Sequence, residues 1–374
     1  MSNQIISIFI PSVHGGGAER AMLVFGAELI KRGFAVDLVV AKFQGPHVDR
    51  IPHGMRVIDL QSSRMLRAIP KLINYLRNTR PRAVFSTITH ANIAAVWAAC
   101  RANINVPVIV RQSNAPRAET KSSFGRYIAS QIIPYAYPRA AGIIAVSDGV
   151  KSELLELNRA LVGLTKVIPT PVLTDDIQRQ ASQPTGHPWF DSPDLPIVLS
   201  AGRLEPHKGM LDLVQAFRLV RNSRRARLVI LGEGSQRSRI EREVQELGLK
   251  GDVDLPGFVA NPFCFMQQAR VFALASYYEG LPNVLIQAMA CGTPVVSTDC
   301  RSGPSEILAG GSLGQLVPVG DSRGLARAIE LSLELPKQTE AQRLVWERYG
   351  AELATSQYLQ IAGISPNIPI ESRT

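Results

Sequence analysis

The sequence predicts an α/β protein of two domains, each a doubly wound parallel sheet covered by helices, that face each other across a cleft. Three observations support this prediction. The chain has 374 residues, more than one hydrophobic core normally serves. Apolar segments of strand length alternate with segments of helical period in both halves, which is typical of parallel sheets. Between Thr170 and Pro196 the alternation stops and prolines gather, which indicates a connection between domains.

The first half contains the strand and helix signals of one such domain. Its first segment, IISIFI, favours a core strand over a signal peptide, because no basic region precedes it. A helical period then runs from Ala18 to Arg32 and is closed by Gly33, a residue suited to a helix C-terminus. The strand segments that follow are AVDLVVA, AVFSTI, VPVIV and GIIAVS.

The second half repeats this order. PIVLSAG precedes a helix from about Met210, and ARLVILG precedes a helix from about Ser235. VFALAS, a helix over Pro282–Cys291 and the strand PVVST come next. Ligands of such sheets bind at the carboxyl ends of the strands, so two facing sheets would place the ligand site in the cleft.

The predicted organisation has five parts. They are a first domain over residues 1–170, a linker over 171–196, a second domain over 197–336, a C-terminal helix over 337–362 that packs back on the first domain, and a flexible tail over 363–374.

The composition is that of a soluble globular protein, with 45% apolar and 19% charged residues. The apolar run from Ile93 to Cys100 is too short to span a membrane. The four cysteines have no metal-ligand spacing and lie in or beside apolar runs. They predict free, mostly buried thiols and a cytoplasmic location.

The positive net charge of +10 lies in the first half of the chain. Residues 1–180 contain 22 Lys and Arg against 11 Asp and Glu. Such a surface suits an anionic membrane or an anionic acceptor, with unspecific solubility as the alternative. Nucleic acid is disfavoured because no zinc-ligand spacing or aromatic RNA-binding motif accompanies the charge.

Two strand ends carry loops suited to a phosphate group. HGGGAER contains Gly16 and Gly17, which let a helix start approach a ligand closely. AGRLEPHKGM places Arg203 and Lys208 in one loop, where two cations can hold a diphosphate without a metal ion. A plain tight turn and solvated loop charges are the alternatives for these segments.

A third strand end, YEGLPNVLIQAMACGT, joins a carboxylate to a helix start. Pro282 suits the first turn of a helix, so the amides of Asn283 and Val284 lie at its positive end, where a phosphate binds favourably. Glu279 precedes this end. Gln287 follows Asn283 by four residues and therefore lies on the same helix face, one turn deeper.

The chain resembles the retaining glycosyltransferases of family 4, which have the GT-B fold of two Rossmann-like domains. The matching segments cover nearly the whole chain in the family's order, and the likeness is strongest to bacterial enzymes of polysaccharide and lipid-linked glycan synthesis. They are GGAER, GIIAVSDGV, AGRLEPHKG, LGEG, PGFVANP and EGLPNVLIQAMACGTPVVSTDCRSGPSEIL.

The resemblance implies roles for individual residues. Arg203, Lys208 and the amides of Asn283 and Val284 would hold the donor diphosphate, with Gly16 and Gly17 approaching it from the other domain. Glu279 would bind sugar hydroxyls near the anomeric carbon, Leu281 would be a further donor-binding residue, and Phe258 and Val259 would receive the base. The implied catalytic residues are Glu279, His90, Arg203 and Lys208.

Two features depart from the family pattern. The second glutamate of the family's signature, which binds the ribose diol, is Gln287 here; an amide can accept from one hydroxyl and donate to the other. His90 is the best candidate for an N-terminal histidine near the reacting sugar, although its surroundings do not align and a structural role is the alternative.

The Asp252-Val253-Asp254 segment fits a metal-binding pattern of many nucleotide-sugar enzymes. It lies in a turn that leads into a short strand, which favours ordinary turn residues. We therefore expect no metal ion and no cofactor beyond the nucleotide diphosphate sugar as co-substrate.

The expected function is a retaining transfer from a nucleotide diphosphate sugar, with UDP preferred, to a hydroxyl of a glycan or lipid-linked saccharide in polysaccharide biosynthesis. The alternatives are a GT-B epimerase or phosphorylase, and a non-catalytic subunit that binds sugar nucleotides. The segment SRMLRAIPKLINYLR predicts an amphipathic helix with a basic face, suited to peripheral docking on the inner face of the cytoplasmic membrane. Its alternative is a crossover helix that packs on the sheet.

Overall fold

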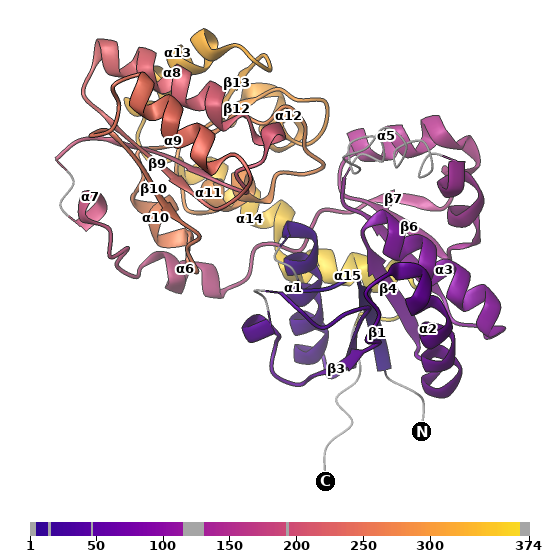
Figure 1. Ribbon diagram of the computed structural model, residues 1–374. Coiled ribbons are helices and arrows are strands. Elements are labelled where there is room, and N and C mark those ends of the chain that lie inside the picture. Colours follow the sequence, from indigo (N-terminus) through magenta and orange to yellow (C-terminus); the bar gives the residue numbers. More distant parts are fainter. Residues whose placement is uncertain (1–4, 14–15, 46–47, 115–130, 192–193, 367–374) are drawn as a thin grey trace. The chain divides into compact units, whose positions relative to one another are not determined.

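The computed structural model describes residues 5–13, 16–45, 48–114, 131–191 and 194–366, which form two compact units (Figure 1). Unit 1 comprises Met1–Val172 and Tyr349–Thr374, and unit 2 comprises Leu173–Arg348. Each unit contains one sheet whose strands all pair in parallel. The α/β class predicted from the sequence is confirmed.

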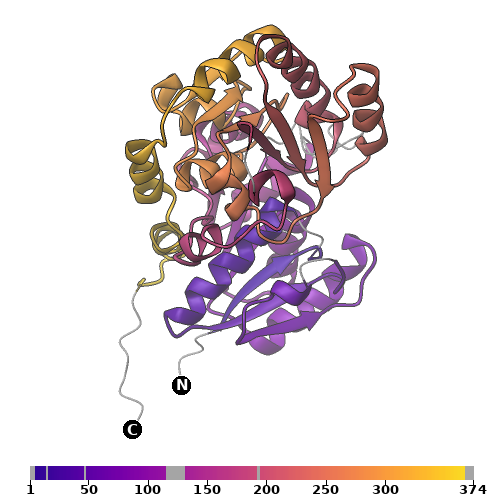
Figure 2. The same cartoon turned by 90° about the vertical axis from the view of Figure 1, so that its left-hand side faces the viewer.

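The sheet of unit 1 has the strand order β3-β2-β1-β4-β5-β6-β7. The order reverses between β1 and β4, which is the switch point where ligands of doubly wound sheets bind. Helices cover both faces: α2 packs beside α3, and α1 packs beside α15 (Figures 1 and 2). The elements are β1 (Ile5–Ile10), α1 (Gly17–Lys31), β2 (Ala35–Val40), β3 (Met55–Asp59), α2 (Met65–Thr79), β4 (Ala83–Thr87), α3 (Thr89–Ala102), β5 (Val108–Gln112), β6 (Gly142–Ala145), α5 (Asp148–Leu157), β7 (Thr165–Val167) and α15 (Ala351–Ile361).

The C-terminal helix α15 completes the core of unit 1. Tyr358 is fully buried, and its ring lies 5.2 Å from that of Phe25 on α1 and 6.3 Å from that of Phe85 on β4. Burying aromatic rings of this size contributes about 1.5–3 kcal/mol each. Helix α15 is therefore an integral part of the same unit as β1 and α1.

The sheet of unit 2 has the order β10-β9-β8-β11-β12-β13, with its switch point between β8 and β11. The elements are α6 (Asp176–Ala181), α7 (Pro188–Asp191), β8 (Ile197–Ala201), α8 (Met210–Ser223), β9 (Arg227–Leu231), α9 (Arg237–Glu246), β10 (Val253–Gly257), α10 (Phe263–Gln268), β11 (Val271–Leu274), α11 (Asn283–Ala290), β12 (Val295–Thr298), α12 (Pro304–Ile307), β13 (Gln315–Val317), α13 (Ser322–Leu333) and α14 (Thr339–Tyr349).

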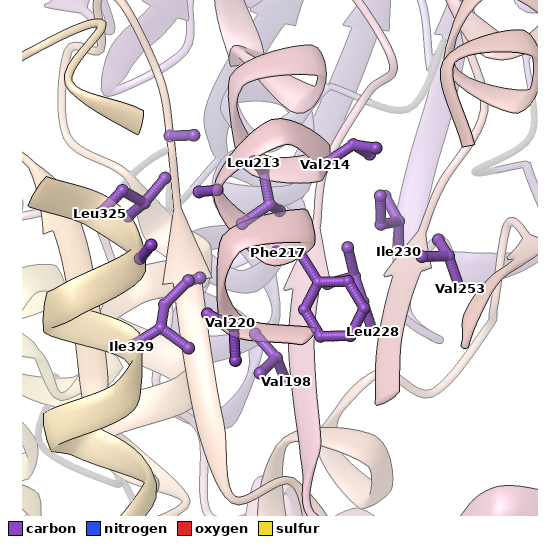
Figure 3. Close-up of a cluster of buried hydrophobic side chains, with 14 of the residues drawn as sticks. Val198, Leu213, Val214, Phe217, Val220, Leu228, Ile230, Val253, Leu325 and Ile329 are labelled. Carbon is purple, nitrogen blue, oxygen red and sulfur yellow. The ribbon is translucent and has the colours of Figure 1, made fainter. Parts of the chain in front are cut away.

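The main core of unit 2 lies between its sheet and the helices α8 and α13. Phe217 of α8 and Ile329 of α13 point to the strands that carry Val198 and Leu228 (Figure 3). All four side chains are fully buried. This packing fixes β8, whose carboxyl end leads into the loop with Arg203 and Lys208.

The segment predicted as a linker contains helices and packs as part of unit 2. Residues 171–196 contain α6 and α7, and this segment belongs to unit 2 from Leu173 onward. Asn261 donates a hydrogen bond to the backbone oxygen of Gln180 at 2.7 Å, and the ring of Phe190 packs 5.0 Å from that of Phe265. These contacts are the reason that the segment joins unit 2 despite its prolines.

The predicted C-terminal segments also differ from the structure. Residues 337–362 form two helices, α14 and α15, because the chain leaves the helical conformation at Gly350 (ψ 136°). The predicted flexible tail starts too early, since Ile364 is only 4% exposed and belongs to the core of unit 1. Residues 367–374 lie outside the described part.

All four cysteines are free thiols; Cys100 is exposed and the other three are buried. Among the described residues, no helix has the length and apolar character needed to cross a bilayer.

Candidate functional site

The switch point of unit 2 brings together two loops that are distant in sequence. β8 and β11 are neighbours in the sheet and run in parallel, so their carboxyl ends lie at the same edge. Residues 202–209 follow β8, and residues 275–282 follow β11. This edge is where the ligands of doubly wound sheets bind.

The two loops are packed against each other through backbone and ring contacts. Gly209 has φ +61°, and a Cβ atom there would lie 2.0 Å from the backbone oxygen of Ala275. The Tyr277 amide donates to the His207 carbonyl at 2.8 Å. The rings of His207 and Tyr278 stack with centroids 4.7 Å apart. Only glycine permits this close approach, which holds the loops in one arrangement.

Within this arrangement, Lys208 and Glu279 form an ion pair. Lys208 Nζ donates to Glu279 Oε1 at 2.6 Å, and the side chains are 15% and 9% exposed. Ser276 Oγ donates to the same oxygen at 2.7 Å. Glu279 Oε2 accepts no hydrogen bond from another described residue, so it can accept one from a ligand hydroxyl.

Two further groups set the charge of the site. The Arg203 guanidinium is exposed and pairs with no other described side chain. The pKa of His207 is lowered chiefly by burial and next by the Lys208 charge; Glu279 opposes and Arg203 adds to the effect. His207 is therefore neutral at pH 7, and the charges near it are the Lys208 and Arg203 cations and the Glu279 and Glu205 carboxylates. Glu205 accepts from Ser235, whereas Arg203 pairs with no described side chain and can bind a diphosphate.

Helix α11 begins directly behind Glu279. Pro282 is its N-cap residue, and the Leu285 amide donates to the Pro282 carbonyl at 3.0 Å. Asn283 and Val284 are its first two residues, and the preceding Leu281 is 7% exposed. The positive end of the α11 dipole thus lies next to the carboxylate and can stabilise a bound anion.

Gln287 lies one turn into α11. It is only 5% exposed, yet its side-chain amide makes no hydrogen bond to another residue of the described chain. The amide atoms are not fully enclosed by protein atoms, so a ligand hydroxyl could bind them.

The loops after β9 and β10 extend the same edge of the sheet. A Cβ at Gly232 would lie 1.9 Å from the Gly202 oxygen, and one at Gly234 would lie 2.5 Å from the Leu204 oxygen. These close approaches explain both glycines of the LGEG segment. Phe258, which follows β10, is 59% exposed, and Val259 is half-buried.

The two aspartates of the metal-binding pattern have protein partners. Asp252 pairs with Arg221 at 2.9 Å. Asp254 lies 2.8 Å from His187 Nε2, while His187 Nδ1 accepts from the Trp189 amide. The proton of His187 must therefore be on Nε2, which donates to Asp254. Both carboxylates thus serve contacts within unit 2.

The remaining candidates lie in unit 1, at its own switch point. Gly16 is the N-cap residue of α1 and Gly17 its first residue; His14 and Gly15 of the same motif lie outside the described residues. A Cβ at Gly16 would lie 2.3 Å from Glu19 Oε2, so the side chain of Glu19 folds back over this helix start. Because the end of the Glu19 side chain can shift, this contact does not by itself require glycine at position 16.

His90 is the second residue of α3, after the carboxyl end of β4. The ring is exposed, but surrounding protein atoms partly desolvate it and lower its pKa. The imidazole is consequently neutral at pH 7 and can accept or donate a hydrogen bond.

The structure brings together Arg203, Lys208, Glu279 and the start of α11 within one unit. Ser276 joins them, although the sequence analysis did not identify it. The available signal was its position, three residues before Glu279 at the end of a core strand. A lone serine there does not reveal that its hydroxyl turns toward the carboxylate.

Two family models match the chain. One, described as "Glycosyl transferases group 1", matches residues 189–351, and another, described as "Glycosyltransferase Family 4", matches residues 15–176. The first match covers the switch-point loops of unit 2, and the second covers most of unit 1.

Individual proteins show the same similarity. An N-acetylgalactosaminyltransferase of Campylobacter jejuni, named for a diphospho-undecaprenol-linked saccharide, is 26% identical over 90% of this chain and 92% of its own length. An uncharacterized glycosyltransferase of Methanocaldococcus jannaschii is 29% identical over 66% of this chain, which spans 62% of that protein.

The fold is shared with a solved structure. Anabaena HepE, crystallised with UDP-glucose, has a TM-score of 0.79 at 20% identity, covering 96% of this chain and 99% of that one. Two Rossmann-like parallel-sheet domains, as expected from the resemblance, are confirmed.

Proposed function

Because the chain belongs to the glycosyltransferases that these two family models describe, we propose that it is a retaining enzyme that uses a UDP-sugar. The sugar is transferred to a hydroxyl of a glycan or lipid-linked saccharide in polysaccharide biosynthesis. The observation that carries the proposal is the Lys208–Glu279 pair, held with Arg203 at the switch point of unit 2. The relatives support the donor and acceptor classes, since HepE was crystallised with UDP-glucose and the Campylobacter enzyme is named for a lipid-linked acceptor.

In this proposal the donor diphosphate binds Arg203, Lys208 and the amides at the start of α11. Glu279 Oε2 accepts from a hydroxyl of the donor sugar, while Oε1 stays with Lys208 and Ser276. As the bond to the sugar breaks, negative charge builds up on the diphosphate. Cations that are already in place stabilise that charge more than the ground state, which lowers the barrier.

The acceptor binds unit 1 in this proposal. Retention follows if the acceptor hydroxyl attacks from the face that the diphosphate leaves, and the departing diphosphate takes the acceptor proton. His90, a neutral imidazole at the end of β4, is the candidate to orient a hydroxyl near the reacting sugar.

A donor screen tests the proposed function. Purified protein is incubated with radiolabelled UDP-, GDP- and ADP-sugars and with lipid-linked saccharides from a bacterial membrane extract. We expect transfer from a UDP-sugar, with the product linkage in the anomeric configuration of the donor by NMR. An inverted linkage, or no transfer from any donor, would contradict the proposal.

Gln287 is expected to hold the ribose diol of the donor. This bond exists before, during and after transfer, so it contributes uniform binding. Gln287→Ala should raise the donor KM roughly 5- to 30-fold, the value of one or two neutral hydrogen bonds, with kcat nearly unchanged. Gln287→Glu should remain active, because its carboxylate can accept from both hydroxyls. Donor titrations measure both variants.

Gln267, an exposed glutamine on α10, supplies the matched control. Gln267→Ala should leave the donor KM unchanged. An unchanged donor KM in Gln287→Ala, or an inactive Gln287→Glu, would exclude the ribose assignment.

We also expect transfer to proceed without a divalent cation. Arg203 and Lys208 supply positive charge at the diphosphate, and both aspartates of the Asp252–Asp254 segment are engaged by Arg221 and His187. Initial rates should differ by less than about twofold between EDTA and Mn²⁺. A rate that vanishes in EDTA and returns with Mn²⁺ would refute this expectation.

Peripheral docking on an anionic membrane is the last part of the proposal. Helix α2 packs on unit 1 through Ala68, Leu72 and Leu76, while Leu66 is 77% exposed beside the exposed Arg67. Lys71 lies on the outer side as well, although it donates to the Leu60 carbonyl at 2.8 Å. The crossover-helix alternative thus describes the packing of α2, and an exposed basic and apolar edge remains.

Sedimentation with vesicles tests this part. Binding to phosphatidylglycerol vesicles at low salt should fall about fivefold for Arg67→Gln, since one basic residue near an anionic surface contributes about 1 kcal/mol. Arg242→Gln, which changes an exposed residue of unit 2, serves as the control. Lack of binding by the wild-type protein at low salt would rule out electrostatic docking.

A further inference from the structure

The turn between β4 and α3 contains a strained residue. Ile88 has φ 75° and ψ 128°, in a region that β-branched residues almost never adopt. It follows the last residue of β4, at the switch point of unit 1, and lies two residues before His90. Such strain persists only where the surrounding structure imposes it, and it is concentrated at functional sites.

Two consecutive residues of β5 clamp this turn on both sides of Ile88. Arg111 Nη1 donates to Thr87 Oγ1 at 3.0 Å. Gln112 Nε2 donates to Thr89 Oγ1 at 3.0 Å. All four side chains are buried, with exposed fractions of 5% or less. The residues before and after Ile88 are therefore both fixed to the neighbouring strand.

A wider network of buried polar groups holds the clamp. Tyr137 Oη donates to Gln112 Oε1 at 2.6 Å and accepts from Asn92 Nδ2 at 3.1 Å. Asn92 Oδ1 accepts from Ser86 Oγ at 2.6 Å. Tyr137, Gln112, Asn92 and Ser86 are fully buried. Networks that are satisfied in this way fix one geometry, because any shift leaves a buried polar group unpaired.

The C-terminal helix takes part in the same clamp. Arg111 donates from Nε to Tyr358 Oη at 3.0 Å and from Nη2 to Thr170 Oγ1 at 2.7 Å. This guanidinium is 3% exposed, and its hydrogen-bond partners in the described chain are hydroxyl groups rather than a carboxylate. Burying a cation in this way is unfavourable unless each donor is satisfied. Tyr358 of α15 thus helps to hold the β4–α3 turn.

We propose that the strained β4–α3 turn is a positioning device that presents His90 to the acceptor hydroxyl bound at unit 1, with Gln112, Tyr137 and Arg111 as its positioning residues. The inference rests on the proposed transferase activity. The β4–α3 turn is expected to affect the rate of the chemical step and not donor binding, because the donor is assigned to unit 2. Loosening the turn therefore lowers kcat and leaves the donor KM unchanged.

Two matched tyrosine variants test the role in turnover. Tyr137→Phe removes the hydroxyl that joins Gln112 to Asn92 and should lower kcat about 10-fold, with the donor KM unchanged. Tyr75→Phe removes another hydroxyl of unit 1, which bonds Asp37 at 2.6 Å and Ser7 at 2.7 Å away from the turn. It should lose thermal stability to a similar degree and keep the wild-type kcat.

A second pair of variants tests the strain without any enzyme assay. Glycine normally makes a protein less stable than alanine does, because its unfolded chain has more freedom. At a positive φ this order reverses, since only glycine lacks the Cβ that clashes. Ile88→Gly should therefore have a higher Tm than Ile88→Ala.

The outcomes separate the inference from the proposed function. Wild-type kcat in Tyr137→Phe, or equal slowing of both tyrosine variants, overturns the positioning role. A lower Tm for Ile88→Gly than for Ile88→Ala overturns the strain. If the wild-type protein transfers no sugar from any donor, the proposed function fails and the positioning role fails with it, while the Tm order still decides whether the turn is strained.

Discussion

Lys208→Ala is expected to lower kcat about 100-fold, the effect commonly found when one preorganised group is removed from a developing negative charge. Lys208 Nζ lies 2.6 Å from Glu279 Oε1, and the Lys208 side chain is only 15% exposed. The variant therefore loses a charge that the protein holds in place, not one that is free in solvent. Lys208→Arg should recover only part of the rate, because a planar guanidinium does not replace a compact ammonium group. Steady-state rates at saturating donor measure the effect.

The same variant should also lose stability, because Glu279 remains buried without its cation. Combining Lys208→Ala with Glu279→Gln should restore part of the lost Tm and none of the lost kcat. Lys337→Ala is the matched control: Lys337 also lies against protein groups of unit 2, with Nζ 3.3 Å from the Ala269 oxygen. Lys337 is exposed overall, but surrounding protein atoms partly desolvate its ammonium group and lower its pKa to about 8. Loss of kcat in Lys337→Ala equal to that in Lys208→Ala would contradict the assignment.

Ser276→Ala is expected to have a kcat between that of the wild-type protein and that of Lys208→Ala. It removes one neutral hydrogen bond to Glu279 Oε1 and keeps the ion pair. A loss of about 1 kcal/mol, or roughly fivefold in kcat, is expected if the serine only orients the carboxylate.

Gly209→Ala is expected to have the second large effect, on stability and activity together. The new Cβ would lie 2.0 Å from the Ala275 oxygen, at φ +61°. Left-handed strain costs about 1–2 kcal/mol, and forced displacement of packed backbone adds about 1–3 kcal/mol. The two loops must separate, which moves Lys208 relative to Glu279. A decrease in kcat of about 100-fold should accompany the lower Tm.

Gly248→Ala is the control that separates the cost of left-handed backbone strain from the cost of displacing packed backbone. Gly248 has φ +69°, but no atom lies within 4 Å of its Cβ position. It should lose only about 1–2 kcal/mol of unfolding free energy and keep the wild-type kcat. Equal effects of the two variants on kcat would show that close packing of the loops is irrelevant to activity.

Edge strands show where sequence-based prediction of this fold fails. The central strands β1 and β8 were predicted because they are covered on both faces and therefore consist of apolar runs. The strands β3, β7 and β13 were not predicted; each lies at the edge of its sheet and includes partly exposed side chains. Short, partly exposed strands carry a weak apolar signal, and pairing with the neighbouring strand decides their conformation.

Prediction of the candidate site was limited in a similar way. The chemical character of Arg203, Lys208 and Glu279, and their position at strand ends, followed from the sequence. Their contacts did not, because Lys208 and Glu279 are 71 residues apart and meet only through the order of strands in the sheet. Ser276 offered only its position three residues before Glu279, which does not reveal that its hydroxyl reaches the carboxylate.

The sequence by itself determined the parallel-sheet class, the glycine-rich strand ends and the residue types available to a diphosphate. These depend on local periodicity and on the conformational freedom of single residues, which short segments encode. Tertiary structure alone decided that Lys208 pairs with Glu279, that Asp254 binds His187, and that Ile88 is held at a positive φ. Each of these requires groups from different elements at hydrogen-bond distance, and only the packed sheet and helices supply that geometry.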